Sequence, residues 1–179
     1  MKPRSKKCRY CGDRFTPFNS FQKFCFKEDC IKAHNQTEKA RKATKIKREY
    51  KSNDKSLQKE IAQKTFNTYI RMRDKDLPCI SCGTTNPIQY HASHYIAVGK
   101  CKHLRFNLWN VHKSCSVCNS WKSGNLMEYR PRLIEKIGLD KVLHLEKVSN
   151  TKEPCKHSLE YYKRITRIFK KKIKNIAKP

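Results

Sequence analysis

Two cysteine pairs frame the middle of the chain: Cys79-Ile80-Ser81-Cys82 and, further on, Cys115-Ser116-Val117-Cys118. Zinc prefers thiolate ligands, and a Cys-x-x-Cys turn brings two sulfurs to one side of a metal ion. Two such turns complete a tetrahedral structural site. The segment between the pairs is rich in histidine and asparagine, which a structural zinc site does not need. We therefore interpret the metal as a frame and the enclosed segment as a functional site.

A second cysteine quartet lies near the start of the chain, in the order Cys8, Cys11, Cys25 and Cys30. A segment this short cannot bury an adequate core, so we expect a second structural zinc ion to fold it. His34 is an alternative ligand, although a surface histidine is the simpler interpretation. The phenylalanines between the cysteine pairs are expected to cover the metal; they are Phe15, Phe18, Phe21 and Phe24.

The charge balance is strongly basic. The 179 residues include 42 Lys and Arg but only 15 Asp and Glu, a formal net charge of +27. This excess predicts a polyanionic partner, and nucleic acid fits better than an anionic membrane because no helix pairs a broad apolar face with a basic one. There is no apolar run of membrane-spanning length, and Met1–Arg4 lacks the apolar region of a signal peptide. We expect a cytoplasmic protein without a membrane partner, whose ten cysteines bind metal rather than form disulfides.

Helical patterns surround the framed segment. Residues 31–50 are typical of a solvated basic helix, which can be a spacer, a DNA-tracking arm or one strand of a weak coiled coil. An amphipathic helix is expected over 55–74, then a strand over 87–96. Later helices are expected from about Trp121 to Ile137, over 139–147 and over 155–178, with a turn-rich break at 148–154.

These patterns predict a small α+β chain whose core is a β-hairpin followed by a helix, pinned by zinc. We expect four parts: an N-terminal zinc module at 1–34, a basic helical arm at 35–54, a zinc-bound core at 55–147 and a C-terminal basic helix at 148–179. Trp109 and Trp121 are expected in the core, with contact to DNA as the alternative for Trp121. Cys101 and Cys155 have no partner at ligand spacing and are interpreted as free thiols.

Three polar residues in and next to the framed segment are spaced like a known catalytic motif. His94 lies late in the expected strand, Asn110 precedes Cys115, and Asn119 directly follows Cys118. This spacing resembles the HNH endonuclease motif, on its ββα-metal or treble-clef-like scaffold, in the His-Asn-Asn form of zinc-containing phage resolvases. The resemblance implies that His94 is the general base, that Asn110 orients it and that Asn119 helps to hold a divalent ion.

The chemistry requires these residue types. A neutral imidazole can accept a proton from water near pH 7. Mg²⁺ or Mn²⁺ can stabilise charge on the phosphorane, and an amide oxygen is a suitable hard ligand. One position departs from the motif, because Ser93 stands where many HNH sites have an acidic residue or a second histidine. His91 is the nearest replacement ligand. Asn119 can also simply cap a helix, and His94 can be a hydrogen-bonded core histidine.

A longer set of strings resembles the phage NinG family, also called Rap. They are Arg73–Thr84, His94-Tyr95, Leu104–Asn107, Cys115–Asn119 and Lys122–Leu126. The likeness is closest over residues 60 to 140, and the N-terminal quartet and basic helix match in kind. It implies a recombination endonuclease that nicks branched DNA, including Holliday junctions and D-loops. The alternative is a non-catalytic, zinc-stabilised DNA-binding or adaptor protein.

Partners follow from the charge and from this resemblance. Branched DNA is the expected ligand, and phage or host recombination proteins are possible partners. Two cuts in a symmetric junction favour a homodimer, although neither basic helix has a heptad seam. The basic residues expected to contact phosphates, which position DNA without reading its sequence, are Arg105, Lys113 and Lys122 in the core, Arg41, Lys42 and Lys45 in the arm, and Lys170, Lys171 and Lys172 near the C-terminal end.

Overall fold

The computed structural model describes residues 4–151 and 155–178, which form two compact units divided after Asn53. Part of the expected break at 148–154 and most of the Met1–Arg4 segment lie outside these described residues. None of the described helices is long and apolar enough to cross a membrane. The expectation of a small α+β chain with two cysteine quartets is confirmed.

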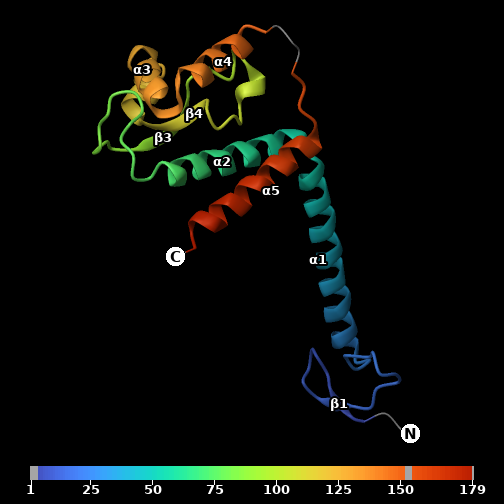
Figure 1. Ribbon diagram of the computed structural model, residues 1–179. Coiled ribbons are helices and arrows are strands. Elements are labelled where there is room, and N and C mark those ends of the chain that lie inside the picture. Colours follow the sequence, from blue (N-terminus) through green and yellow to red (C-terminus); the bar gives the residue numbers. More distant parts are fainter. Residues whose placement is uncertain (1–3, 152–154, 179) are drawn as a thin grey trace. The chain divides into compact units, whose positions relative to one another are not determined.

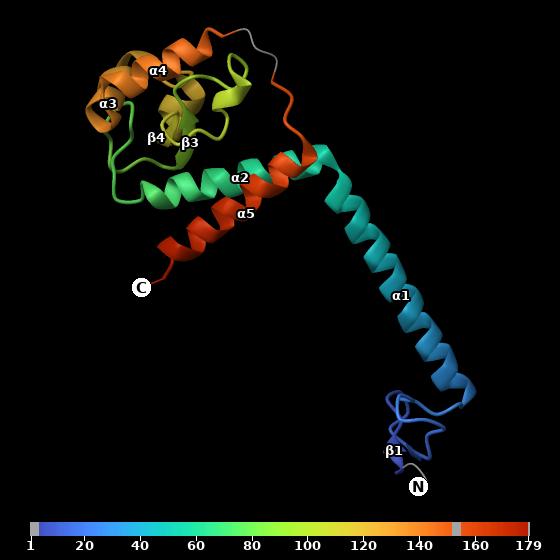
Figure 2. The same cartoon turned by 45° about the vertical axis from the view of Figure 1, so that its right-hand side comes forward.

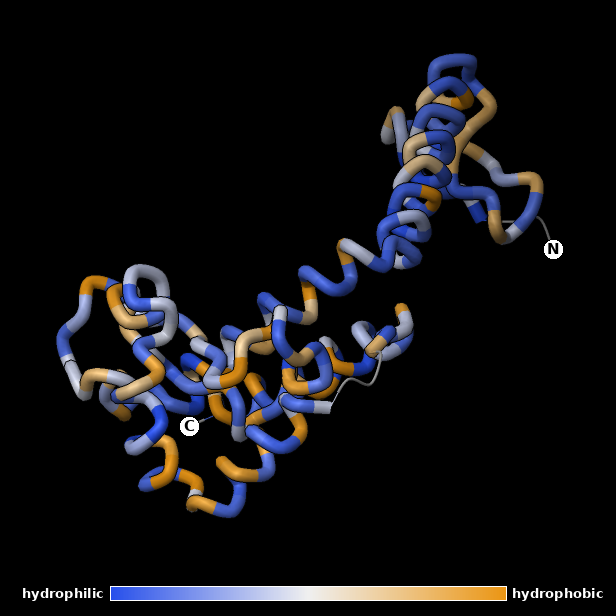
Figure 3. The backbone as a smooth tube through the Cα atoms, turned by 90° about the horizontal axis from the view of Figure 1, so that it is seen from above, coloured by the Kyte–Doolittle hydropathy of each residue, from blue (hydrophilic) through white to orange (hydrophobic). Residues whose placement is uncertain are grey.

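The first unit holds a short antiparallel ribbon and one long helix. Strands β1 (Lys6–Lys7) and β2 (Arg14–Phe15) pair with each other, and α1 (Glu28–Asn53) follows. Within α1 only Cys30 is buried, and Figure 3 shows this helix as mostly hydrophilic. The basic helix expected over 31–50 is confirmed and extends further at both ends.

The phenylalanines of this unit do not all cover the cysteines. Phe15 and Phe24 pack against the buried sulfurs, together with Tyr10. Phe18 and Phe21 are 90% and 87% exposed, so the expectation that they cover the metal is wrong.

The second unit is built on two helices that lie side by side, α2 (Lys55–Arg73) and α5 (Leu159–Ile176) (Figure 1). Asp54 begins α2 because its side-chain oxygen accepts the backbone N–H of Ser56 and Leu57. Ser158 caps α5 in the same way by accepting from the Tyr161 N–H. The last helix therefore starts at Leu159, whereas the sequence pattern predicts a start at Cys155.

A β-hairpin lies between α2 and two further helices (Figures 1 and 2). Strand β3 (Tyr90–His94) pairs antiparallel with β4 (Val111–Cys115), so that His94 lies opposite Val111. The connection contains a short 3-10 turn, η1 (Lys102–Leu104). After the hairpin come a π-helical turn and two helices, which are η2 (Val117–Trp121), α3 (Leu126–Ile137) and α4 (Leu139–Ser149).

Each face of the hairpin has its own apolar cluster. On the α2 and α5 side, Phe66 packs edge-on against Phe106 and Phe169, with ring centroids 5.4 and 4.8 Å away. On the other side, Tyr129 and Leu133 of α3 are completely buried with residues of α4 and the β3–β4 connection. Burial of these rings holds the hairpin between two helical layers.

The segment after the second cysteine pair differs from expectation. Ser123, Gly124 and Asn125 all have positive φ, so a continuous helix from Trp121 is impossible and α3 begins only at Leu126. The end at Gly138 is confirmed, since its N–H binds the Ile134 carbonyl at φ 90°. The tryptophans expected in the core are not there: Trp109 is 41% exposed and Trp121 85% exposed.

A buried carboxylate joins α2 to the hairpin and α3. Asp74 accepts two hydrogen bonds from Arg73 and one from the Lys113 backbone N–H, and its Oδ1 lies 3.2 Å from Lys136 Nζ. Burial opposes its ionisation, but His112, Arg73 and Lys136 outweigh burial and hold the pKa of Asp74 well below its usual range. Arg73 also donates to the His112 ring, so one network fixes the end of α2 against β4.

Replacing this carboxylate should destabilise the fold in a pH-dependent way. We expect Asp74→Asn to lower the free energy of unfolding at pH 7 by about 3 kcal/mol, because it leaves the partly buried Arg73 and Lys136 without a counter-charge. The folded-state pKa is lowered, so the stabilisation is present above the unfolded pKa of about 3.9 and is lost as pH falls below it.

Denaturant titrations between pH 3 and 7 measure this difference, which should shrink toward the acid end. Asp76→Asn is the matched control, because Asp76 is exposed nearby. Equal stability of the Asp74→Asn and Asp76→Asn proteins at pH 7 would contradict the assignment.

Candidate functional site

The sulfurs of the core quartet come from three places. Cys79 and Cys82 lie in a turn after α2, Cys115 ends β4, and Cys118 lies in η2. Gly83 closes the turn with positive φ, and its N–H binds the Cys79 carbonyl at 2.9 Å. The Cys82 and Cys115 sulfurs are 3.8 Å apart. Four sulfurs bound to zinc at about 2.3 Å stand about 3.8 Å from one another, so the quartet already has zinc-site dimensions.

The electrostatics of this quartet also fit a cation. The Cys79 sulfur accepts the Cys115 N–H and contacts the Ser114 hydroxyl. Burial would raise its pKa, but these hydrogen bonds lower the pKa of Cys79 to about 6. Burial and the neighbouring sulfurs raise the pKa of Cys118 to about 12. Four thiols this close cannot all ionise together unless a cation compensates their charge, which a zinc ion does.

The N-terminal quartet has the same dimensions. Its sulfurs are 3.7 Å apart between Cys8 and Cys30 and 3.5 Å apart between Cys25 and Cys30. The alternative ligand, His34, instead stacks on Phe24 with ring centroids 4.4 Å apart. Both quartets can therefore hold a zinc ion through four sulfurs each.

His94 has a defined tautomer. Its Nε2 lies 2.9 Å from the Arg105 carbonyl oxygen, and because a carbonyl only accepts, Nε2 must carry the proton. Burial lowers the pKa of His94, against the opposing effect of that hydrogen bond. A neutral ring with Nε2 protonated has its lone pair on Nδ1. Arg105 in turn donates to Gln63 of α2, which fixes the loop that presents the carbonyl.

Asn110 is buried and shapes the same loop. Its Oδ1 accepts the Ile96 N–H at 2.7 Å, and its Nδ2 donates to the carbonyls of Ile96 and Leu104. Leu104 directly precedes Arg105. Asn110 therefore acts on His94 through the backbone of the β3–β4 connection, and no hydrogen bond among the described residues joins the two side chains.

Asn119 meets His91. The Asn119 Nδ2 lies 3.2 Å from His91 Nδ1, and Asn119 belongs to the π-helical turn η2, a type of turn found often at functional sites. These are the two side chains that sequence reasoning nominated for the catalytic metal. The structure brings them together at the end of the hairpin next to the cysteine quartet.

The predicted base His94 and the predicted metal ligands His91 and Asn119 do not form one cluster. His91 and His94 are three positions apart on β3, and side chains alternate between the faces of a strand, so they project to opposite faces. Ala92, on the face of His94, packs in the cluster near α2. Within the described part of the chain, no hydrogen bond or ion pair joins His94 to Asn119. The site therefore consists of two halves.

The basic residues predicted to contact phosphates differ in their exposure to solvent. Lys113 is only 4% exposed, its Nζ donates to the Lys75 carbonyl at 2.8 Å, and it lies over the Tyr90 ring. Its assignment to DNA contact is therefore wrong, because β4 is buried on both faces. Arg105 is half-buried, and the remaining nominated residues are exposed; these are Arg41, Lys42, Lys45, Lys122, Lys170, Lys171 and Lys172.

Sequence reasoning missed several residues that position the site. Gln63 holds Arg105, and the Arg73–Asp74–His112 network holds β4. Amphipathic periodicity gave no signal for Gln63, since it is a polar residue at a half-buried helix position. For Asp74 the sequence does carry a signal, namely an acid and a base side by side at the very end of a helix.

The sequence of the whole chain matches one known protein family. A family profile described as "Bacteriophage Lambda NinG protein" matches residues 1–179. The chain belongs to the NinG family. The resemblance inferred from the sequence is thereby confirmed at the level of the family.

Individual NinG relatives agree. Protein ninG of Escherichia phage 933W is 38% identical in an alignment of 178 positions, which covers 87% of this chain and 89% of the relative. Protein ninG of Enterobacteria phage H19B is 39% identical over 179 residues with the same coverage. Protein ninG of Escherichia phage lambda is 50% identical over 99 residues, 53% of this chain and 48% of the relative. No solved structure matches the chain.

Removing one sulfur from either quartet of this NinG protein should remove one metal ion. We expect Cys11→Ser and Cys82→Ser each to lower the bound zinc by one equivalent relative to the wild type, because three ligands hold a structural ion much less tightly. Elemental analysis of the dialysed proteins measures this. Each variant is the control for the other, since each leaves the second quartet intact, and a zinc content equal to wild type would remove that quartet as a site.

Proposed function

We propose that this chain is a metal-dependent endonuclease of the HNH type that nicks branched DNA, such as Holliday junctions and D-loops. The observation that carries the proposal is the hydrogen bond from His94 Nε2 to the Arg105 carbonyl. It leaves a neutral imidazole with its lone pair at Nδ1, which is the state that a general base requires at pH 7. The charge of +27 supports a nucleic-acid substrate.

In this proposal His94 Nδ1 removes a proton from water as the water oxygen bonds to phosphorus. The bond from phosphorus to the 3′ oxygen then breaks, and that oxygen leaves. Asn110 is a positioning residue, because it fixes the loop whose carbonyl holds the His94 ring. His91 and Asn119 offer a nitrogen and an amide oxygen that would hold Mg²⁺ or Mn²⁺, with the Asn119 side chain turned over to present its oxygen. When bound, such an ion stabilises charge on the phosphorane and on the leaving oxygen.

Basic residues of α5 give this proposal a DNA-binding face. Lys163, Arg167, Lys170, Lys171 and Lys174 line one shallow groove along α5. Side chains spaced by three and four residues share one side of a helix, so these cations can follow a phosphate backbone. The action of a homodimer on a symmetric junction, with other recombination proteins of phage or host as partners, belongs to the same proposal.

A second candidate function is a zinc-stabilised DNA-binding or adaptor protein without catalysis. The observation that favours it is the placement of His91 and His94 on opposite faces of β3, since a working HNH site needs the base and the metal near one phosphate. The two candidates share DNA binding and differ in cleavage.

Cleavage of a synthetic four-way junction with Mg²⁺ or Mn²⁺ separates the candidates. We expect the wild type to nick the junction and His94→Ala to lose at least 100-fold in rate while binding is unchanged, because only the proton acceptor is removed. His144→Ala is the matched control, as His144 is an exposed histidine on α4. Tight binding by the wild type without nicking would establish the second candidate, and loss of binding in His94→Ala would make His94 a structural residue.

The salt dependence of binding tests the α5 groove. We expect Lys171→Gln with Lys174→Gln to reduce the slope of log affinity against log salt by about 0.9 for each phosphate that the variant no longer neutralises. Fluorescence anisotropy of a labelled junction over a range of salt concentrations measures the slope. The charge-matched control is Lys100→Gln with Lys147→Gln, two exposed lysines outside the groove. Equal slopes for both double variants would show that α5 does not contact the DNA.

A further inference from the structure

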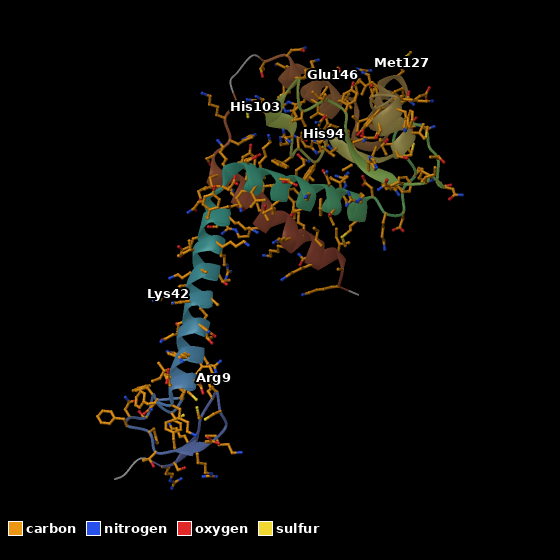
Figure 4. All side chains as sticks on the ribbon, turned by 180° about the vertical axis from the view of Figure 1, so that it is seen from behind. Arg9, Lys42, His94, His103, Met127 and Glu146 are labelled. Carbon is orange, nitrogen blue, oxygen red and sulfur yellow. The ribbon has the colours of Figure 1, made fainter. Side chains whose placement is uncertain are left out.

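The same tripeptide occurs twice in the chain, as Cys101-Lys102-His103 and as Cys155-Lys156-His157. The first copy leads into η1 and the second lies in the segment that approaches α5. The structure brings the copies together: His157 Nε2 is 3.3 Å from the Lys102 carbonyl oxygen, and the rings of His103 and His157 have centroids 6.5 Å apart. Figure 4 shows His103 at the edge of the second unit, where the chain passes toward α5. Neither quartet contains any of these residues.

The second copy already has ligand geometry. The Cys155 sulfur lies 3.2 Å from His157 Nε2. Sulfur and nitrogen bound to one tetrahedral zinc ion, at about 2.3 and 2.05 Å, stand about 3.5 Å apart. The two atoms need to separate by only a few tenths of an ångström to admit an ion between them, and the Nε2 proton that faces the Lys102 carbonyl must move to Nδ1.

The first copy supplies a buried thiol. Cys101 is 5% exposed, and its sulfur lies 3.9 Å from the Val148 carbonyl oxygen. The second copy lies beside it, since His157 Nε2 contacts the carbonyl oxygen of Lys102, the residue next to Cys101. The interpretation of both as ordinary free thiols without a partner is therefore incomplete.

We propose that Cys101, His103, Cys155 and His157 form a third zinc site of the Cys₂His₂ type. Two sulfurs and two imidazoles are the donors that zinc prefers, whereas Mg²⁺ prefers oxygen. Unlike the sulfurs of the two quartets, no three of these four donors lie within 4.8 Å of one another, so binding requires side chains to move toward the ion. His103 is exposed on a short turn, so its side chain is free to rotate toward His157, whose ring centroid is 6.5 Å away. Binding converts both thiols to thiolates and releases their protons.

Such a site has a structural consequence. With four protein ligands it has no open position, so it is a clamp and not a reaction centre. It ties the segment before α5 to η1, and η1 is followed directly by Arg105, whose carbonyl holds His94. The C-terminal helix would thus be fastened to the loop that presents the candidate base.

Zinc content under reducing conditions tests the proposal. We expect three zinc ions per chain in the wild type and two in the double variant His103→Ala with Cys155→Ser. The variant leaves both quartets intact, and His103 is exposed and Cys155 partly exposed, so folding should be preserved; circular dichroism checks this. His144→Ala, which removes an exposed histidine elsewhere, should retain three ions. The readout is independent of cleavage, so it stands or falls separately from the endonuclease proposal.

Alkylation of individual cysteines gives a second measurement on the unmutated protein. We expect iodoacetamide to modify Cys155 at least tenfold more slowly in the zinc-loaded protein than after mild chelation. Two zinc ions in the wild type, three in the double variant, or equal Cys155 alkylation with and without chelator would each overturn the proposal. A disulfide between Cys101 and Cys155 under the same reducing conditions would overturn it as well, because it would assign the pair to redox chemistry.

Discussion

The convergence of four sulfurs at the end of the β-hairpin is the constraint on which the second unit depends. Cys79 follows α2, Cys115 ends β4 and Cys118 lies in η2, so one cluster joins the ends of three elements, next to the Asp74 network that also links α2 to β4. A metal at this point would fix the position of β4 relative to α2, and with it the direction of every side chain on the hairpin. A slip of one residue would exchange the two faces and separate Asn119 from His91.

Buried hydrogen bonds connect the position of β4 with the position of the loop that contacts His94. The Asp74 network holds β4 against α2, and Asn110 satisfies three backbone groups inside the β3–β4 connection. An apolar residue at position 110 would leave these buried groups unpaired, at a cost of a few kcal/mol. Asn110 therefore serves the loop first, and any effect on His94 passes through the Arg105 carbonyl. A polar core of this kind favours one loop conformation over its alternatives.

Much of this architecture could be predicted from the residues themselves. Cysteine spacing identified both quartets because ligand geometry leaves few alternatives, and apolar periodicity placed α2 almost to the residue. The start of α3 could not be predicted in this way, because the left-handed conformations at Ser123 and Asn125 come from the close approach of Gly124 to Ser81 and Cys118. The burial of Lys113 likewise depends on a tertiary partner, the Lys75 carbonyl, that no local pattern reveals. The opposite orientation of His91 and His94 is a simple consequence of their odd spacing on one strand.

The long helix α1 has a consequence of a different kind. Apart from Cys30 it has no buried side chain, so its helical state is maintained by its own backbone hydrogen bonds and by pairs such as Glu28 with Lys32 and Glu38 with Arg41. The remaining Lys and Arg side chains of α1 repel one another, and this repulsion favours the extended coil over the helix. Any polyanion that lies along it removes this repulsion, so binding and ordering of the helix are thermodynamically linked. The helix content of α1 therefore depends on the concentration and charge of the anions around it.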